Sequence, residues 1–206
     1  MPATLPAIDP AVEIVVSSTG MTQGTAQTDD VQIKPRLYLK IGQFETGLLW
    51  RNIDSDLAGG VGVIFVRTSR KLSRLQLDGG IAYRIRTGVK VPHKSHAWEF
   101  NAGLRRDFGK VILSGTVEYS PREFERGYSL YVEGGPVLTL TKTIKLSANA
   151  GRRERRGAPD YTAVNVGMTK VVVDGVALDL RFYATSKPDI GERYRSRLVA
   201  SARITL

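Results

Sequence analysis

Residues 31–41, VQIKPRLYLKI, decide the fold class, because apolar and polar side chains alternate along them with a period of two. One face of the expected strand carries the apolar residues Val31, Ile33, Leu37, Leu39 and Ile41. The other face carries Gln32, Lys34, Arg36, Tyr38 and Lys40. A tight break at Gly42 and Gln43 follows, and a second strand is expected at 44–50. The stretch therefore predicts an antiparallel hairpin whose two faces meet different surroundings.

The same pattern recurs along the chain, and the breaks between the strands alternate in length. Short breaks of a few residues alternate with breaks of roughly eight to eleven residues. The expected strands cover 11–19, 31–41, 44–50, a segment from 61, 75–86, 97–106, 111–119, a segment from 128, 144–151, 161–172, 176–185 and 194–206. Outer-membrane barrels place short turns at the periplasmic rim and long loops at the outer rim. The rhythm thus predicts an all-β fold, a transmembrane antiparallel up-and-down β-barrel of about twelve strands.

Length and composition agree with one such unit. The chain has 206 residues, 21 glycines and no cysteine, which suits a turn-rich protein without a disulfide framework. We expect a short N-terminal segment at 1–10 and the barrel at 11–206. The first six residues lack both a basic region and an apolar run, so we expect an exported protein whose signal peptide is absent from this sequence. No cofactor is expected.

The net charge of +10 raises the question of an anionic partner. No recognition helix or aromatic-basic RNA motif is present, which argues against nucleic acid. The basic residues are instead spread along the polar strand faces and the expected outer loops, where lipopolysaccharide phosphates would be neighbours. The densest basic cluster lies at 152–156. The candidates for lipopolysaccharide or anion contact are therefore Arg152, Arg153, Arg155 and Arg156. An ordinary solvated loop is the alternative.

Aromatic residues fall at the ends of the expected strands, on the apolar face. Five lie beside expected long loops, and Phe44 lies near the opposite rim; the five are Trp50, Trp98, Tyr119, Tyr128 and Tyr194. Aromatic girdles of this kind mark the two membrane interfaces of a barrel. The alternative is that these rings fill the core of a soluble sandwich.

The polar face is densely ionic and would line the lumen. The candidate pore-lining residues are Lys34, Arg36, Lys40, Glu45, Asp78, Arg84, Glu99, Arg105, Glu118, Glu133, Asp179, Arg181, Arg197 and Arg203. The same face also carries Glu13, Arg51, Arg86, Lys145 and Arg195. One interpretation is a narrow water-filled pore whose cationic excess favours anions. The other is a lumen closed by arginine–carboxylate pairs, with a structural or interaction role.

Several segments also resemble a known family. Residues 17–24, SSTGMTQG, and 44–54, FETGLLWRNID, are similar to the opening of the TORF family of bacterial outer-membrane porins. Later segments at 98–104, 117–121 and 131–135 are similar too. The resemblance implies an outer-membrane barrel with a porin role, and it implies neither a defined substrate nor catalytic residues.

Two other classes of protein compete with this interpretation. An outer-membrane hydrolase could use the His and Ser side chains of the segment 93–96, HKSH, but no third group is evident to orient a histidine. A soluble ligand-binding barrel similar to a lipocalin would show the same alternation. Two histidines and no cysteine make a metal site improbable, although Asp29 and Asp30 could bind a cation. We therefore predict a protein that is not an enzyme and has no metal.

The expected partners are those of a monomeric outer-membrane channel. They are membrane lipid, lipopolysaccharide, small solutes and, through the alternating terminal strand that ends at Leu206, the barrel assembly machinery. Three features fit this scheme poorly. Pro35 and Pro136 interrupt expected strands, and the strand from Val61 is apolar on both faces, as if it met a loop folded into the lumen.

Overall fold

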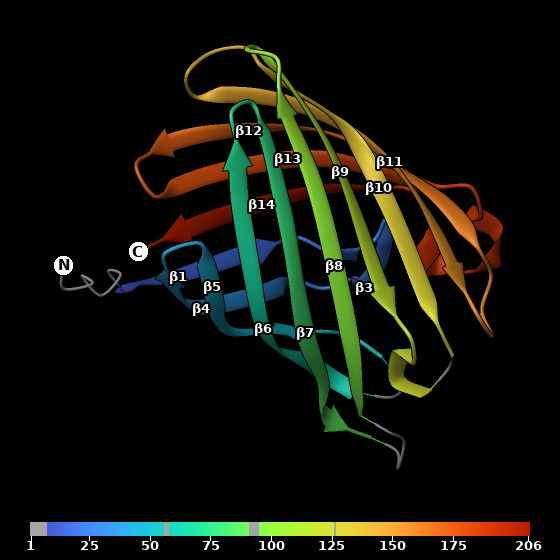
Figure 1. The fold of residues 1–206 in the computed structure, drawn as a ribbon. Helices are drawn as coiled ribbons and strands as arrows, with labels where there is room; N and C mark the ends of the chain where they lie inside the picture. Colours follow the sequence, from blue (N-terminus) through green and yellow to red (C-terminus); the bar gives the residue numbers. More distant parts are fainter. Residues whose placement is uncertain (1–7, 56–57, 91–94, 126) are drawn as a thin grey trace.

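The fold is a closed antiparallel β-barrel, as the sequence predicts (Figure 1). In the computed structural model, residues 8–55, 58–90, 95–125 and 127–206 are described. Within them, twelve strands close one barrel. The strands are β1 (Ile8–Ser17), β4 (Gln32–Ile41), β5 (Phe44–Asn52), β6 (Ala58–Leu72), β7 (Leu75–Val89), β8 (His96–Asp107), β9 (Val111–Ser120), β10 (Ser129–Thr139), β11 (Ile144–Arg155), β12 (Tyr161–Val173), β13 (Val176–Thr185) and β14 (Arg197–Thr205).

The barrel is closed by its first and last strands. Each strand from β5 to β13 pairs with the barrel strands that precede and follow it in the chain. The first strand, β1, pairs with both β4 and β14, through registers such as Glu13 with Arg36 and Glu13 with Thr205. The start of β1 and the end of β14 consequently lie at the same end of the barrel (Figure 1). Strand β1 begins at Ile8, before the expected boundary at residue 11, and residues 1–7 of the predicted N-terminal segment lie outside the described ranges.

Connection lengths alternate as expected. Short turns at 42–43, 73–74, 108–110, 140–143 and 174–175 share the end that carries the termini. The long connections at the other end hold the two-stranded hairpin β2 (Gly20–Thr22) and β3 (Thr25–Thr28) and the short 3-10 turns η1 (Glu123–Glu125), η2 (Pro188–Ile190) and η3 (Glu192–Tyr194). Within the described residues, no helix is long and apolar enough to cross a membrane.

The outer face of the barrel is apolar. Large side chains there are exposed, for example Leu48 at 53%, Val166 at 58% and Leu198 at 64%. The buried apolar groups are few and lie in small clusters on the inside, such as that of Tyr38, Phe65 and Ala82. This distribution reverses that of a soluble barrel, and it is the one expected of a barrel surrounded by lipid.

Most of the predicted girdle aromatics are exposed at the rims. Trp50, Trp98, Tyr119 and Tyr128 lie on or beside strand ends next to long connections, and Phe44 begins β5 at the short-turn end. The prediction is wrong for Tyr194. The residue is only 6% exposed, and its ring meets that of Tyr161 edge-on, with ring centroids 5.4 Å apart. Strand β14 begins only at Arg197, so the 3-10 turn η3 that carries Tyr194 folds back against the barrel wall.

Strand β6 has two apolar faces because its inner face covers protein rather than water. Val61 and Phe65 are each 3% exposed on the inside. Val61 lines a cavity together with Ala26 of β3, and Phe65 packs against Tyr38 of β4. The expectation that this strand meets a loop folded into the lumen is met only in part: Val61 borders the same cavity as Ala26 of β3, whereas Phe65 packs against wall strands.

The two prolines lie where the backbone hydrogen bonding between neighbouring strands is interrupted. Backbone pairing between β4 and β5 stops at Arg36. Beyond Pro35, the Asn52 side chain replaces the missing backbone partners: it accepts a hydrogen bond from the Ile33 amide at 2.8 Å and donates one to the Val31 carbonyl at 2.9 Å. Pairing between β10 and β11 skips Gly135 and Pro136 without a change of register. A closed barrel thus accommodates both prolines, because each removes an amide hydrogen where a ladder is already interrupted.

Candidate functional site

The candidate site is the lumen, which contains several polar cavities. A central cavity of about 630 Å³ is lined by predicted pore-lining residues of six strands, namely Lys34, Arg84, Glu99, Glu118, Glu133 and Arg181. A second cavity of about 490 Å³ is lined, among others, by Arg36, Glu45, Asp78 and Arg105. Asp179 and Arg203 line a third of about 260 Å³. The alternation seen in the sequence therefore places these twelve side chains on the inner wall.

The remaining two candidates lie toward the ends of the barrel. The ammonium group of Lys40 lies 5.5 Å from the ring centre of Tyr38, near the short turn at 42–43. The Arg197 guanidinium pairs with Asp29 of the first long connection at 2.7 Å and donates to the carbonyl of Glu192 at 3.0 Å. Asp29, which was considered as a cation ligand, thus binds an arginine. The described residues contain no group of three or more side chains suited to a metal ion.

The hairpin β2–β3 projects into the lumen and is anchored at its tip. The Gln23 side-chain amide donates to Glu118 at 2.5 Å, and its oxygen accepts a hydrogen bond from Arg153. The Tyr161 hydroxyl donates to the Gln23 carbonyl at 2.9 Å. At Gly24, with φ of +78°, an added Cβ would lie 2.2 Å from the Cβ of Ala163. The hairpin tip is therefore fixed against β9, β11 and β12 at once.

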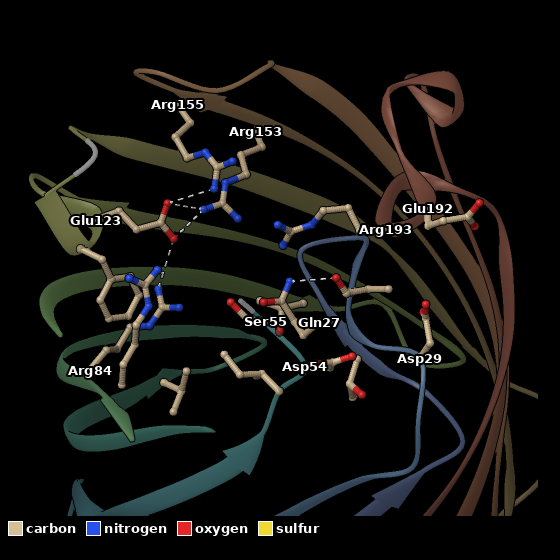
Figure 2. A pocket seen from close by; sticks show the side chains of 17 residues that line it. Gln27, Asp29, Asp54, Ser55, Arg84, Glu123, Arg153, Arg155, Glu192 and Arg193 are labelled. Carbon is tan, nitrogen blue, oxygen red and sulfur yellow. Dashed lines mark hydrogen bonds and ion pairs between the residues drawn. The ribbon is translucent and has the colours of Figure 1, made fainter. Parts of the chain in front are cut away.

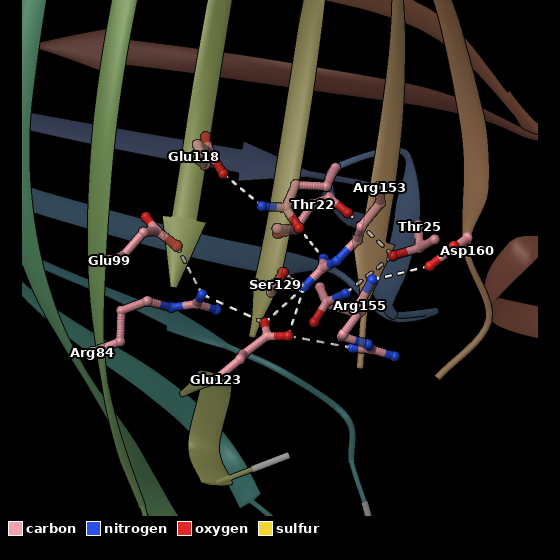
Figure 3. A network of polar contacts seen from close by, with 12 residues as sticks. Thr22, Thr25, Arg84, Glu99, Glu118, Glu123, Ser129, Arg153, Arg155 and Asp160 are labelled. Carbon is pink, nitrogen blue, oxygen red and sulfur yellow. Dashed lines mark hydrogen bonds and ion pairs between the residues drawn. The ribbon is translucent and has the colours of Figure 1, made fainter. Parts of the chain in front are cut away.

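A network of charges lies beside this tip (Figure 3). Arg84 pairs with Glu99 at 2.8 Å and approaches Glu123 at 3.7 Å. Arg153 contacts both carboxylate oxygens of Glu123 at 2.8 and 2.7 Å, and Arg155 lies 3.5 Å from the same group. Burial alone would raise the pKa of Glu123, but the guanidinium groups of Arg153, Arg84 and Arg155 outweigh it and lower that pKa.

Toward the short-turn end, arginines stack on aromatic rings. The Arg36 guanidinium lies 4.3 Å from the ring centre of Tyr38 and 4.9 Å from that of Phe65, and it pairs with Glu45 and, at 3.9 Å, with Glu13. Arg67 lies 4.8 Å from the Phe65 ring centre. Such cation–π contacts hold a guanidinium close to the wall while it still forms ion pairs.

The wall formed by β10, β12 and β13 is held by neutral and charged donors together. Arg181 binds Asp179 at 3.0 Å and donates to Asn165 at 2.7 Å. The Tyr131 hydroxyl donates to Glu133 at 2.8 Å. Glu133 makes no ion pair with a described cation, and neither does Glu118, so neutral donors stabilise both carboxylates in the central cavity.

Three cations of the central cavity have no carboxylate partner within the described part of the chain. They are Lys34 of β4, Arg51 of β5 and Arg67 of β6. These strands are adjacent in the barrel, whereas Glu99, Glu118 and Glu133 stand on β8, β9 and β10. The cavity is therefore basic on one arc of the wall and acidic on another.

The basic cluster at 152–156 is not one loop. Strand β11 continues to Arg155, so alternate side chains point in opposite directions. The predicted outer-loop position is wrong for Arg153 and Arg155, because the Arg153 residue is 6% exposed inside the barrel and Arg155 joins the same inner network. Arg152 is exposed and pairs with Glu154 at 2.9 Å, and Arg156 is also exposed.

Other predicted side chains bear little on the lumen. Arg195 is not on the inner face, because it is exposed and pairs with Glu192 at 2.7 Å in the last long connection. Of the residues considered for hydrolysis, His93 lies outside the described ranges, and the His96 ring packs 5.8 Å from the Tyr83 ring. Arg67, Gln23 and Glu123 were not predicted. Arg67 could have been identified if the sequence had shown which residues of β6 face inward. No local sequence signal distinguishes Gln23 and Glu123 from ordinary loop residues.

Comparison with known proteins identifies the fold. No protein-family model and no curated protein matches the chain, so the resemblance to TORF porins is not confirmed. Among solved structures, the KdgM porin is similar, with a TM-score of 0.66 at 9% identity over 94% of this chain and 98% of that one. The NanC porin has a TM-score of 0.61 at 7% identity, covering 94% and 97%. An outer-membrane channel from Pseudomonas putida F1 has a TM-score of 0.61 at 10% identity, covering 99% and 96%. The chain thus has a porin-like barrel.

Proposed function

We propose that the protein is a narrow outer-membrane channel for small solutes and that it favours anions. The observation that carries the proposal is a set of central-cavity cations that form no ion pair with a carboxylate of the described residues, namely Lys34, Arg51 and Arg67. Cations that are already paired with carboxylates contribute little net field, whereas unpaired ones lower the barrier for a negative solute. The basic arc on β4, β5 and β6 is then the wall along which an anion passes.

Two further observations support this function. The apolar outer face, with exposed aromatic residues near both rims, suits an outer-membrane location. The KdgM porin, which has a similar fold, is known in complex with a disordered oligogalacturonate, a carboxylate-bearing saccharide. By analogy, the solutes of the present barrel would also carry negative charge. The proposal includes the porin role that the TORF resemblance implies. It also includes the expectation that the protein has no enzymatic activity.

The remaining partners follow from the orientation of such a barrel. With short turns toward the periplasm, the exposed Arg152 and Arg156 face the outer leaflet, where lipopolysaccharide phosphates would contact them. The alternating strand β14 would serve recognition by the assembly machinery during insertion. We propose a monomer, because each barrel encloses its own lumen and has no free strand edge.

A closed lumen is the second candidate. It is favoured by the ion pairs of Arg36 with Glu45 and of Arg181 with Asp179, and by the hairpin anchored across the interior. Purified protein added to a planar lipid bilayer in symmetric KCl separates the two candidates. Discrete current steps are expected of the channel. A protein that inserts without producing any step would be a structural or interaction barrel instead.

A further inference from the structure

One carboxylate in the outer half of the lumen faces three guanidinium groups. Arg153 contacts both oxygens of Glu123 at 2.8 and 2.7 Å, Arg155 lies at 3.5 Å and Arg84 at 3.7 Å. Arg153 also donates to the Ser129 hydroxyl at 2.9 Å. The Glu123 and Arg153 residues are only 8% and 6% exposed. This arginine cluster, Arg84, Arg153 and Arg155, is therefore built around a buried carboxylate.

The cations and the carboxylate come from different kinds of structure. Arg84 stands on β7, and Arg153 and Arg155 stand on β11, so the arginines belong to the barrel wall. Glu123 belongs to the short turn η1 in the connection between β9 and β10. The wall fixes the arginines, whereas a loop supplies the carboxylate.

The turn that carries Glu123 has an unusual backbone conformation. Phe124 has φ of 47° and ψ of 43°, a left-handed conformation that aromatic residues rarely adopt. Its ring lies 4.0 Å from the Arg86 guanidinium and 5.2 Å from that of Arg84. The strained turn is thus held in place by the arginines on which Glu123 and Phe124 rest.

A cavity of about 360 Å³ lies directly against the cluster (Figure 2). Its lining includes Arg84, Glu123, Arg153 and Arg155, and also Arg193 of the last long connection. Cavities that bind small ligands begin at about 300 Å³. The space beside the cluster is therefore large enough for a monosaccharide-sized solute.

The cluster has more donors than Glu123 can use. The Nε atoms of Arg153 and Arg155 are both buried without a hydrogen-bond partner in the described part of the chain. Both arginines also line the adjoining cavity, so a ligand in that cavity lies within reach of the cluster. This position indicates a site for a ligand with more acceptor atoms than one glutamate.

We infer that Arg84, Arg153 and Arg155 form a binding site for the carboxylate of a small organic acid, and that Glu123 occupies this site until a solute exchanges with it. The inference rests on the proposed channel function for its role in transport. A solute carboxylate would replace the same charge-assisted hydrogen bonds, and its other oxygens would reach the adjoining cavity. Because Glu123 is tethered beside the site, it competes at a high effective concentration and weakens the apparent affinity for the solute.

Calorimetric titration of the purified protein in detergent with D-glucuronate, and with D-glucose as the uncharged counterpart, tests the site. In Glu123→Gln the competitor has no charge, so we expect glucuronate to bind about tenfold more tightly than to the natural protein. Glucose should show no such gain. Adding Arg153→Gln to Glu123→Gln should abolish the gain. Glu154→Gln is the matched control, because Glu154 is a half-exposed carboxylate at the same end of β11, paired with Arg152 outside the cluster.

The inference is overturned if folded Glu123→Gln shows no gain for glucuronate, if glucose gains equally, or if Glu154→Gln gains as much. Circular dichroism of each variant establishes that the barrel is intact. Failure of the site and failure of the channel remain distinguishable. Current steps without a binding gain would reject the site and keep the channel, whereas a binding gain without current steps would keep the site and reject the channel.

Discussion

The side-chain amide of Gln23 donates a hydrogen bond of 2.5 Å to the carboxylate of Glu118, although the two residues are 95 positions apart. Gln23 lies at the tip of the hairpin β2–β3, and Glu118 lies on β9 in the barrel wall. The bond joins the first long connection to the interior. The width of the central cavity therefore depends on where this hairpin tip is held.

Removing the Gln23 side chain should release the hairpin tip. In Gln23→Ala the bonds to Glu118 and Arg153 are lost, which should cost about 2–4 kcal/mol of unfolding free energy and should raise single-channel conductance. Gln27→Ala is the control, because among the described residues the Gln27 side-chain amide donates only to its neighbours Thr25 and Ala26. Bilayer recordings and urea unfolding measure the two effects. Equal conductance in both variants would show that the tip does not limit current.

A methyl group at Gly24 should push the hairpin off the wall. Alanine at Gly24 and at Gly42 both enter left-handed backbone, at φ of +78° and +60°, which costs about 1–2 kcal/mol. At Gly24 the methyl group also meets the Ala163 side chain, whereas at Gly42 no atom of the described residues beyond its chain neighbours lies within 4 Å. We expect Gly24→Ala to lose about 1–3 kcal/mol more than Gly42→Ala. Thermal melting of both variants measures the difference, and identical losses would contradict the packing of the tip.

Neutralising the unpaired cations should reduce anion preference. Arg51→Gln and Lys34→Gln each remove from the central cavity a charge that forms no ion pair with a carboxylate of the described residues. The reversal potential in a KCl gradient should therefore move toward the potassium value in both variants. Lys142→Gln, which removes a charge from the exposed turn between β10 and β11, should leave it unchanged. Three equal shifts would mean that net charge, rather than position in the lumen, sets selectivity.

The stabilising effect of Glu123 should depend on pH. Its pKa is lowered in the folded protein, by Arg153, Arg84 and Arg155 acting against the effect of burial. Its contribution is then complete above the unfolded value of about 4.3 and is lost as the pH falls through the lower folded value. The natural protein should exceed Glu123→Gln in unfolding free energy at pH 7, and the gap should close below about pH 4. A gap that stays constant from pH 7 to pH 3 would contradict the charged contact.

An arginine on the apolar face should hinder insertion in a depth-dependent manner. Val166 lies midway along β12 and is 58% exposed, and Val173 lies at the short-turn end of the same strand and is 59% exposed. Val166→Arg should cost about 2–4 kcal/mol of folding free energy in lipid vesicles, and Val173→Arg about 0–1 kcal/mol. Vesicle refolding from urea measures both. Equal costs would argue that β12 does not cross a bilayer.

The barrel could be predicted from the sequence because its determinants are local. Alternation over 31–41 sets the two faces of one strand, and connection length tells which end of the barrel a connection occupies. The expected strand at 176–185 coincides with β13, and those at 111–119 and 161–172 differ from β9 and β12 by one residue. Twelve of the fourteen candidate pore-lining side chains border lumen cavities for the same reason.

The interior of the lumen could not be predicted, because long-range contacts determine it. Hydrogen bonds with Glu118, Arg153 and Tyr161 hold Gln23 in position. The sequence of the segment 20–28 does not indicate those partners. Arg153 was expected in an outer loop because strand β11 runs four residues past its predicted end at 151. The burial of Tyr194 likewise depends on Tyr161, which lies 33 positions earlier in the chain.

The most direct test of the channel is the reversal potential of single channels in a planar bilayer with a tenfold KCl gradient. The unpaired Lys34, Arg51 and Arg67 predict current steps that reverse on the chloride side of zero. A reversal potential on the potassium side, or insertion without any current step, would contradict an anion-favouring channel.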